Sequence, residues 1–493
     1  MTLPFKNLPS NVRVPLFYAE VDNSQANTAT LNKRALIIGQ ITSAGIATPN
    51  VPILCQGVAE AASQGGPGSM LHLQTQMYRL NDTFGEVWLL PVADDGSAVA
   101  AAGSIAVTAA ATTSGVFYLY IAGVRIAVTI LSSMTTAQAA TAINNAINAT
   151  PNLPVTSSVS SSTVTITARN KGPHGNDIDI RANYLGTAGG EALPPGFAYT
   201  LTAMSGGLTA PTLTTALSNL SDKPFDYIVC PYTDPTSLNA LKTLLDDNTG
   251  RWSWSRQIYG HFFAAARGTS GTLTTLGTAR NDQHGSIAGL NGSPTPPWLI
   301  SAAFAAQAAV ADRADVGRPL HTLVLQGVLA PDMASRFTLS ERNTLLYSGI
   351  STLSIADDGS VAIEQAITTY QQNSFGQPDD SYLKVETLFL LTAVIRLLRT
   401  RVTSKYARMK LANDGTRYAA GSAVVTPSVI RADLIAAYRE MEGLAWVQNA
   451  DAFAQALIVQ RNAQNPNRVD VLWPGTLINQ LDILALLAQF RLS

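Results

Sequence analysis

Few residues in this chain have the types and spacing that metal binding would require. His174, Asp177 and Asp179 lie close together and could supply metal ligands. However, the run 171–176 has the composition of a turn, and the two aspartates alternate with isoleucines as in a strand. We therefore interpret this segment as a surface turn that leads into a strand.

Two glycine-rich runs bear on phosphate binding and nucleophilic catalysis. The run 65–70 precedes a predicted helix, but it lacks the spacing of a dinucleotide or P-loop motif, and no lysine follows it. The run 268–271 lacks the serine-centred spacing of a nucleophile elbow. The five histidines form no triad signature, and the Asp-Asp pairs adjoin turns. The sequence thus predicts no enzyme activity, no cofactor and no metal site.

The densest run of charge lies between residues 384 and 417. It contains eight lysines and arginines against two acidic residues, Glu386 and Asp414. Such a run is either a solvated helix face or a positive patch that faces an acidic partner surface. Nucleic acid is a weaker alternative, because no interleaving of aromatic side chains accompanies the basic residues beyond Tyr406.

Both ends of the chain are extended and apolar. Val12, Val14 and Leu16 alternate with other residues, and Pro15 excludes a central strand there. The segment 477–492 is a long apolar tail. An unpaired terminal strand is an aggregation hazard, so each end either pairs with the sheet of a neighbouring copy or folds into its own sheet. The residues alone leave both interpretations open.

Composition narrows the class of protein. The chain has 493 residues, and its charged fraction of 13% is about half the usual ~25%. A net charge of -1 favours self-association and argues against a nucleic-acid binder. The two distant cysteines exclude a disulfide framework and a thiolate zinc cluster. Without a secretory signal or a run of ~18 apolar residues, we expect a soluble protein that folds in a cytoplasm.

Alternating strand and helix patterns predict a mixed α/β and α+β multidomain chain. Ser69 is a predicted helix cap, and the alternation predicts a mostly parallel sheet flanked by helices. The predicted strands are 35–38, 86–92, 227–230, 260–265 and 285–288, and the predicted helices are 70–80, 235–245, 272–280 and 297–311.

Composition shifts mark an inserted region and a different C-terminal part. Residues 93–207 hold nine charged residues and 26 Ser and Thr, with strand patterns at 116–130 and 155–166 around a helix at 135–149. Helices are predicted at 388–402, 427–441 and 451–456, with a strand at 468–472. The expected organisation is an N-terminal arm (1–30), an α/β domain in two parts (31–92 and 208–375), an inserted β-rich outer domain (93–207), a C-terminal α+β inner domain (376–475) and a C-terminal arm (476–493).

An ordered series of short runs adds a resemblance to a known family. The runs include 341–346, 349–352, 358–359, 367–371, 380–387, 405–412, 425–427, 461–462 and 466–468, together with 66–70 and the N-terminal arm. The series resembles contractile tail sheath proteins of bacteriophages, most closely the sheath of Mu-like phages. The likeness touches nearly the full length and is weakest in 93–207. Its specificity comes from the order of the runs.

The resemblance implies a structural subunit that consumes no nucleotide. Such subunits form stacked hexameric rings around a tail tube, and contraction drives the tube through the bacterial envelope. The implied partners are further copies, the tail tube protein, and baseplate and tail terminator proteins, without nucleic acid or membrane insertion. The implied location is the virion tail, assembled in the host cytoplasm. The alternatives are the sheath of a related contractile injection machine and a non-contractile virion structural protein.

The resemblance also assigns hypothetical roles to two sets of residues. The tube-facing basic set is Arg396, Arg399, Arg401, Lys405, Arg408 and Lys410. The inter-subunit arms carry Val12, Val14, Leu16, Leu484, Leu486, Phe490 and Leu492.

Overall fold

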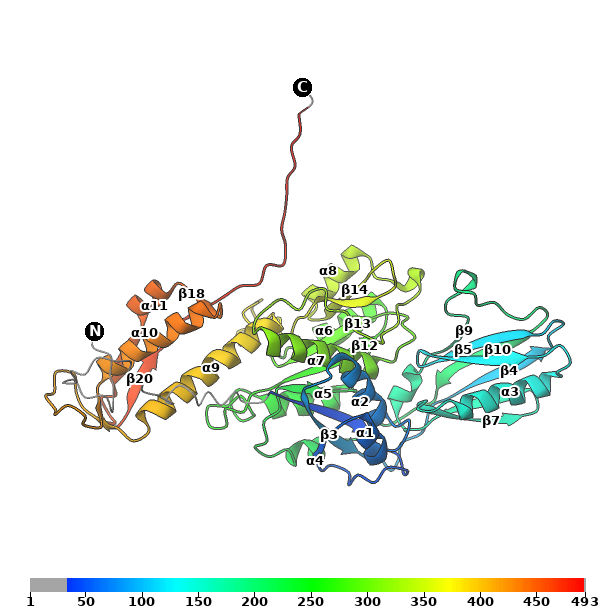
Figure 1. Ribbon diagram of the computed structural model, residues 1–493, viewed down its shortest axis with the longest axis horizontal. Coiled ribbons are helices and arrows are strands. Elements are labelled where there is room, and N and C mark those ends of the chain that lie inside the picture. Colours follow the sequence, from blue (N-terminus) through cyan, green and yellow to red (C-terminus); the bar gives the residue numbers. More distant parts are fainter. Residues whose placement is uncertain (1–32, 492–493) are drawn as a thin grey trace, which may run out of the picture.

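The computed structural model describes residues 33–491 and arranges them in three parts along one axis (Figure 1). The body, residues 33–96 and 209–384, lies in the middle. The β-lobe, residues 97–208, lies at one end, and the C-terminal lobe, residues 385–477, lies at the other. The C-terminal arm, residues 478–491, runs away from the other parts as an extended chain. None of the helices within the described residues is long and apolar enough to span a membrane.

The body is organised around an eight-stranded sheet. Its interior strands are mutually parallel, and only the two edge strands run antiparallel to their neighbours. This confirms the predicted mostly parallel sheet. In spatial order the strands are β15 (Val361–Gln365), β14 (Ser351–Ile355), β13 (Gly285–Leu290), β12 (His261–Arg267), β11 (Tyr227–Val229), β1 (Arg34–Gln40), β3 (Glu86–Val92) and β2 (Ile53–Cys55).

Helices cover both faces of this sheet because successive strand residues point to opposite sides. Leu36 and Ile38 belong to the core beneath α5 (Pro235–Leu245) and α6 (Ser270–Thr278). Ala35 and Ile37 belong to the opposite core, with α1 (Val58–Gly65), α2 (Met70–Asn81) and α7 (Pro297–Ala314). The Ser69 hydroxyl accepts a hydrogen bond from the His72 amide at 3.2 Å, which confirms the predicted cap. The remaining body helices are α4 (Thr214–Ser218) and α8 (Leu339–Tyr347), with a 3-10 turn at Met333–Ser335.

The β-lobe packs two antiparallel sheets and one helix. Ala122 and Gly123 both have positive φ, as a two-residue hairpin between β5 (Gly115–Ile121) and β6 (Val124–Ile130) requires. The four-stranded sheet has the order β10 (Ala198–Ser205), β4 (Ala102–Ala109), β8 (Thr163–Ala168), β7 (Val155–Ser160). The other has the order β6 (Val124–Ile130), β5 (Gly115–Ile121), β9 (Ile180–Ala182). The helix is α3 (Thr136–Ala149), and its Ala139, Ile143 and Ile147 side chains are buried on one face.

The segment 171–176 is the predicted turn leading into a strand, here β9, but only part of it lies at the surface: Lys171, Pro173 and Asn176 are exposed, whereas His174 is buried. It enters a 3-10 helix at Pro173–Asp177, and His174 is only 7% exposed. Its ring lies edge-on to Tyr232 of the body at 6.0 Å, and burial lowers its pKa to about 3. The residues thus form the local turn that their composition predicts. The turn lies between the β-lobe and the body, and this position buries His174. No group of three or more metal-ligating side chains occurs within residues 33–491.

The C-terminal lobe has a small core of its own. Tyr438 stacks on Phe453 with ring centroids 3.8 Å apart, and Trp473 closes the cluster. The helices are α9 (Val385–Tyr406), α10 (Pro427–Gly443) and α11 (Ala450–Ala456). The strands pair as β16 (Lys410–Leu411) with β17 (Val424–Val425), β18 (Val447–Gln448) with β21 (Thr476–Leu477), and β19 (Ile458–Arg461) with β20 (Val469–Leu472).

Candidate assembly surfaces

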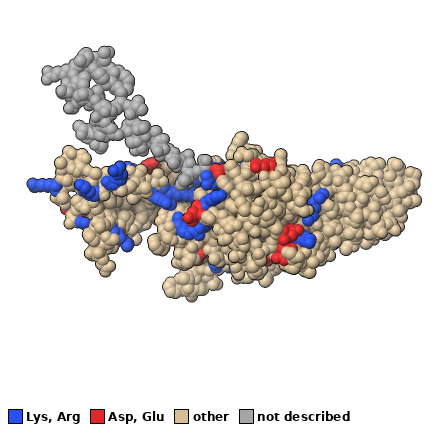
Figure 2. All heavy atoms as spheres, turned by 90° about the horizontal axis from the view of Figure 1, so that it is seen from below, with Lys and Arg blue, Asp and Glu red and all other residues tan. Residues whose placement is uncertain are grey.

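The structure divides the predicted basic set into paired and exposed members. All six residues lie on α9 or just after it. Lysines and arginines are visible over the C-terminal lobe in Figure 2, whereas the face of the β-lobe seen there has almost none. Three members of the set have carboxylate partners within this chain.

Arg401 and Lys405 connect α9 to α10. Arg401 contacts Asp433 at 3.2 Å and Glu440 at 2.5 Å, and Lys405 contacts Asp433 at 2.5 Å. Burial works to raise the pKa of Asp433, but these two cations outweigh it and hold that pKa below its usual value. These charges therefore hold two helices of the lobe together.

Arg396 connects α9 to the body. Its guanidinium lies 2.6 Å from the Asp226 carboxylate, and both side chains are largely buried. It also lies over the ring of Tyr259 at 5.6 Å. The pair therefore fastens the C-terminal lobe to the body at Asp226, the residue before β11. The small cavity beside it, about 40 Å³, is lined by residues of the same joint.

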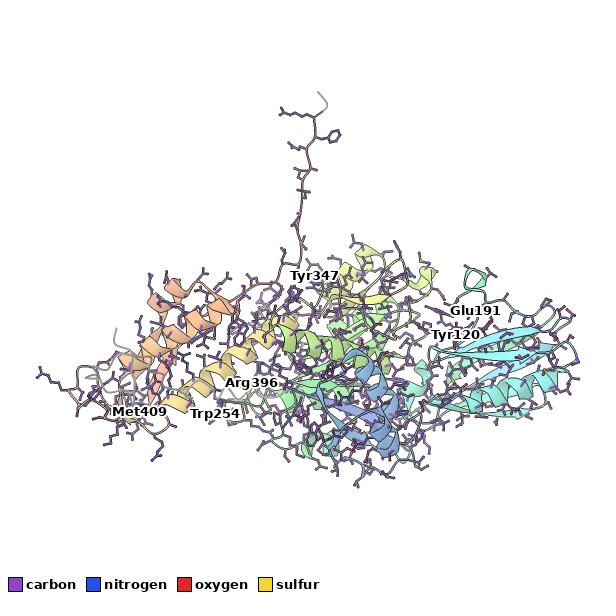
Figure 3. The ribbon with its side chains drawn as sticks, viewed as in Figure 1. Tyr120, Glu191, Trp254, Tyr347, Arg396 and Met409 are labelled. Atoms are coloured by element: carbon purple, nitrogen blue, oxygen red, sulfur yellow. The ribbon has the colours of Figure 1, made fainter. Side chains whose placement is uncertain are left out.

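The rest of the set remains exposed. Arg399 makes only a long 3.4 Å hydrogen bond to the Gln257 carbonyl, and Arg408 and Lys410 have no carboxylate partner among residues 33–491. Two large apolar side chains close to these residues in the sequence are also exposed (Figure 3). Trp254, three residues before Gln257, is 82% exposed, and Met409, between Arg408 and Lys410, is 43% exposed. This exposed part combines positive charge with apolar area, which suits contact with another macromolecule.

The C-terminal arm is anchored at its root and exposed beyond it. The root is held by the pairing of β21 with β18 and by a hydrogen bond from the Gln480 side chain to the Gly317 carbonyl. Asp482 contacts His321 at 2.8 Å and also Lys384. Six large apolar side chains of the arm, from residue 481 onward, are 72–84% exposed: Leu481, Ile483, Leu484, Leu486, Leu487 and Phe490. Of the predicted arm residues, Val12, Val14, Leu16 and Leu492 lie outside the described residues.

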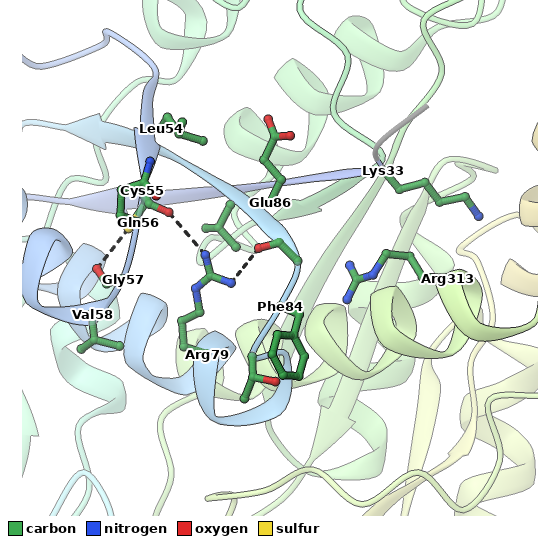
Figure 4. A pocket seen from close by; sticks show the side chains of 13 residues that line it. Lys33, Leu54, Cys55, Gln56, Gly57, Val58, Arg79, Phe84, Glu86 and Arg313 are labelled. Atoms are coloured by element: carbon green, nitrogen blue, oxygen red, sulfur yellow. Dashed lines mark hydrogen bonds between the residues drawn. The ribbon is translucent and has the colours of Figure 1, made fainter. Parts of the chain in front are cut away.

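A large cavity at the edge of the body sheet offers no catalytic arrangement. The depression at the β2 edge, about 870 Å³, contains Lys33, Arg79 and Arg313 (Figure 4). Each of these cations already has a partner: Lys33 contacts Asp312 at 2.8 Å, and Arg313 contacts Asp82 at 2.6 Å. Arg79 donates to the Gly85 carbonyl at 2.7 Å. Burial raises the pKa of the Cys55 thiol there, so it is not an activated nucleophile.

Sequence reasoning missed the acidic partners of the basic set. Asp433 and Glu440 are seven residues apart on α10, so they share one helix face. That spacing indicates an acidic helix face, which could have been matched with Arg401 and Lys405. Asp226 gave no such signal, because its pairing with Arg396 depends on how the body and α9 meet.

The chain is similar to known proteins over its whole length. A model of the phage tail sheath protein central domain matches residues 206–369, and one of the phage tail sheath C-terminal domain matches residues 377–491. The Mu-like prophage FluMu tail sheath protein of Haemophilus influenzae is 38% identical over 494 residues, covering 100% of both chains.

Solved structures of sheath tail proteins are also similar to this chain. One from Desulfitobacterium hafniense has 13% identity and a TM-score of 0.49, with 95% of this chain and 97% of that chain covered. One from Listeria innocua has 13% identity and a TM-score of 0.48, with 91% and 92% covered.

Proposed function

The chain belongs to the phage tail sheath protein family, whose members are structural components of the virion, and we propose that its copies polymerise as stacked hexameric rings around a tail tube. Contraction of this polymer then drives the tube through the bacterial envelope. The energy comes from rearranged contacts between subunits, and no nucleotide is consumed.

The exposed apolar arm is the observation that carries this proposal. Its six large side chains have no core to enter in their own molecule, and each is at least 72% exposed. An extended backbone with unpaired amides and carbonyls is suited to completing the sheet of a neighbouring copy. Apolar side chains of Leu and Phe contribute about 1.5–3 kcal/mol each when they are fully buried. The arm of one subunit therefore holds the next.

Contraction requires some contacts to break while others persist. Exposed ion pairs are worth only about 0–1 kcal/mol each, so surfaces held by them separate easily. A strand paired with a neighbouring subunit has many more contacts and persists as a hinged link. In our proposal the arms keep subunits connected while the bodies rotate.

We propose a tube-facing surface that is smaller than the set of six basic residues. Arg401 and Lys405 hold two helices of the lobe together and Arg396 fastens the lobe to the body, so the proposed tube contacts are Arg399, Arg408 and Lys410. The double variant Arg408→Glu with Lys410→Glu should weaken tube binding by about 1–2 kcal/mol per subunit and leave tube-free polymers intact. Electron microscopy of sheathed and bare tubes measures both. The matched control is Arg439→Glu, an exposed charge on α10, which should bind tubes normally.

Truncation of the arm tests the function itself. A chain ending at Ile483 should fold, as judged by circular dichroism and thermal unfolding, but form no tubular polymers in electron micrographs. A full-length chain with Leu484, Leu486 and Phe490 replaced by Ser is the matched control for length, and it should fail in the same way. Normal polymers from both chains would refute the role of the arm.

A further inference from the structure

A groove of about 1020 Å³ lies between α8 and the chain that follows β15. One wall is a single face of the helix, whose residues are spaced by three or four positions: Leu339, Asn343, Leu346 and Tyr347. Leu345 points away from this wall and is buried in the core of the body. The helix therefore packs on the body through one face and presents a largely apolar face to the groove.

The large side chains of this wall are left uncovered by the part of the chain that the structure describes. Leu339 is 74% exposed and Tyr347 is 81% exposed. Figure 3 shows Tyr347 close to the point at which the C-terminal arm leaves, and Ile483 of that arm lines the same groove. Tyrosine is enriched where proteins contact one another. The groove therefore offers apolar surface beside a segment to which we already assign a contact between subunits.

The opposite wall of the groove carries negative charge without a matching cation. Asp379 and Asp380 line it, and neither has a cationic partner among residues 33–491. The other carboxylates of the groove are matched, because Glu364 contacts Arg342 at 3.0 Å and Asp482 contacts the two basic side chains described above. The groove therefore favours a partner that brings positive charge together with apolar side chains.

The N-terminal segment, residues 1–19, has both properties. It lies outside the described residues, but its sequence is rich in Leu, Val and Phe, and its charged residues are Lys6 and Arg13. The C-terminal arm, residues 478–491, has one acidic and one basic residue and therefore no net charge. The N-terminal segment is thus the better electrostatic match for the wall with Asp379 and Asp380.

Prolines also distinguish the N-terminal segment from the C-terminal arm. Pro4, Pro9 and Pro15 have no amide hydrogen, so they weaken the pairing of this segment with a strand. Residues 478–491 contain no proline, so every amide there can pair. Extended segments with proline bind instead to grooves lined by aromatic side chains, and Tyr347 and Tyr370 line this groove. The two ends of the chain are therefore suited to two different kinds of acceptor.

The position of Lys33 favours an acceptor on another copy. Lys33 precedes β1 and lines the cavity at the β2 edge, whereas the groove lies at the opposite edge, beside β15. Five strand spacings of about 4.8 Å separate β1 from β15, or about 24 Å across the sheet. Residues 20–32 span up to about 45 Å when extended, which is enough to reach an adjacent subunit. Giving a segment at one edge and receiving one at the other is a heterologous contact, which can continue into rings or helices.

We propose that the groove beside α8 binds residues 1–19 of a neighbouring copy. The proposal rests on the proposed function in taking the occupant from another subunit, and it names the site that receives the N-terminal segment. Apolar side chains of the segment cover Leu339 and Tyr347, and Arg13 pairs with the wall that carries Asp379 and Asp380. Because this contact is made by side chains, it leaves strand pairing to the C-terminal arm.

Cross-linking of thiols between full-length chains tests the site. A chain with Val14→Cys is mixed with a chain with Tyr347→Cys and treated with a short bis-maleimide reagent, whose reach tolerates a shift of a few residues. Denaturing electrophoresis should show a covalent dimer, and both native cysteines are buried, so they contribute little background. The matched control is Phe84→Cys, which replaces an aromatic side chain that is 96% exposed at the opposite edge of the sheet. Mixed with the Val14→Cys chain, it should give no dimer above background.

Exchange of charges tests the recognition. Arg13→Glu in the Val14→Cys chain, or Asp380→Lys in the Tyr347→Cys chain, should lower the yield of dimer by up to about fivefold, the effect of one exposed ion pair. Asp380 is exposed, so its replacement leaves the fold intact. Mixing the two reversed chains should restore the yield. Unchanged yields in the single reversals, or no recovery in the mixture, would contradict the pairing of Arg13 with this wall.

Three results would overturn the site itself. The first is the absence of a dimer from the mixture of Val14→Cys and Tyr347→Cys chains. The second is efficient joining of a Leu486→Cys chain to the Tyr347→Cys chain, which would assign the groove to the C-terminal arm. The third is joining within a single chain that carries both Val14→Cys and Tyr347→Cys at high dilution, which would assign the groove to the chain's own N-terminal segment.

Electron microscopy of the same mixtures separates this proposal from the proposed function. Tubular polymers without the covalent dimer would refute the groove as the acceptor and leave the function standing. The covalent dimer in mixtures that never form tubular polymers would support the groove and contradict the function.

Discussion

Large apolar side chains are mostly buried in the body but exposed in the C-terminal arm. In the body, most of α7 is buried, including Trp298, Phe304 and a long series of alanines. In the arm, Leu486 and Phe490 are 83% and 84% exposed. The body is thus complete as a single molecule, whereas the arm presents apolar surface that only another surface can cover. The part of the chain that stabilises the fold is therefore separate from the part to which we assign assembly.

The sharpest test of this difference applies one substitution in both regions. Phe304 is fully buried and meets Phe263 with ring centroids 5.1 Å apart, so Phe304→Ala should lower the free energy of unfolding by about 3–5 kcal/mol. Phe490→Ala should change it by less than about 0.5 kcal/mol, yet reduce polymer formation. Denaturant unfolding and sedimentation measure the two effects. A similar loss of stability in both variants would remove the distinction between the regions.

The same comparison between a buried and an exposed side chain can be made for two basic residues. Arg396→Met leaves the buried Asp226 without its cation and should cost about 2–3 kcal/mol of stability. Arg408→Met changes an exposed side chain and should cost less than about 0.5 kcal/mol. Thermal unfolding of the two variants gives the contrast directly. An equal cost would mean that Arg396 does not fasten α9 to the body.

The smallest expected change in stability concerns Glu191 of the β-lobe, and this change should depend on pH. Glu191 accepts hydrogen bonds from the Tyr120 hydroxyl at 2.7 Å, Arg125 Nε at 2.6 Å and the Leu185 amide at 3.0 Å (Figure 3). Burial works to raise the pKa of Glu191, but these hydrogen bonds outweigh it and lower that pKa.

A carboxyl group with a lowered pKa stabilises the folded state above its unfolded-state pKa, and that contribution is lost as pH falls through the folded-state value. Glu191→Gln should therefore cost about 1–2 kcal/mol at pH 7, and the difference from the parent chain should shrink below about pH 4. Denaturant unfolding of both chains at several pH values tests this. A difference that stays constant with pH would contradict it.

Sequence patterns predicted the local elements well because their causes are local. The helix at 235–245 and the strand at 86–92 have the predicted bounds, and the strand pattern at 116–130 is divided by a turn at Ala122–Gly123. Each depends on residues within a few positions of one another, such as a proline at the first helical turn or a residue that accepts positive φ.

What could not be predicted depends on contacts between distant segments. The burial of His174 follows from its position against Tyr232, and the pairing of Arg396 follows from the meeting of α9 with β11. The helix α8 and the strands β14 and β15 received no prediction, although family-like runs overlap α8 and β14. The arm residues were proposed from the apolar chain ends together with the family resemblance. The contacts of Asp482 with His321 and Lys384 could not be predicted, because they bring three separate segments together.

Hydrogen exchange of the arm amides tests the central claim most directly. In the isolated subunit, amides 484–490 are outside any strand or helix and should exchange at the rate of an unstructured peptide. In assembled polymers the same amides should be protected, because their hydrogen bonds are made to a neighbouring copy. Unprotected exchange of these amides in well-formed polymers would contradict the claim that the arm holds one subunit to the next.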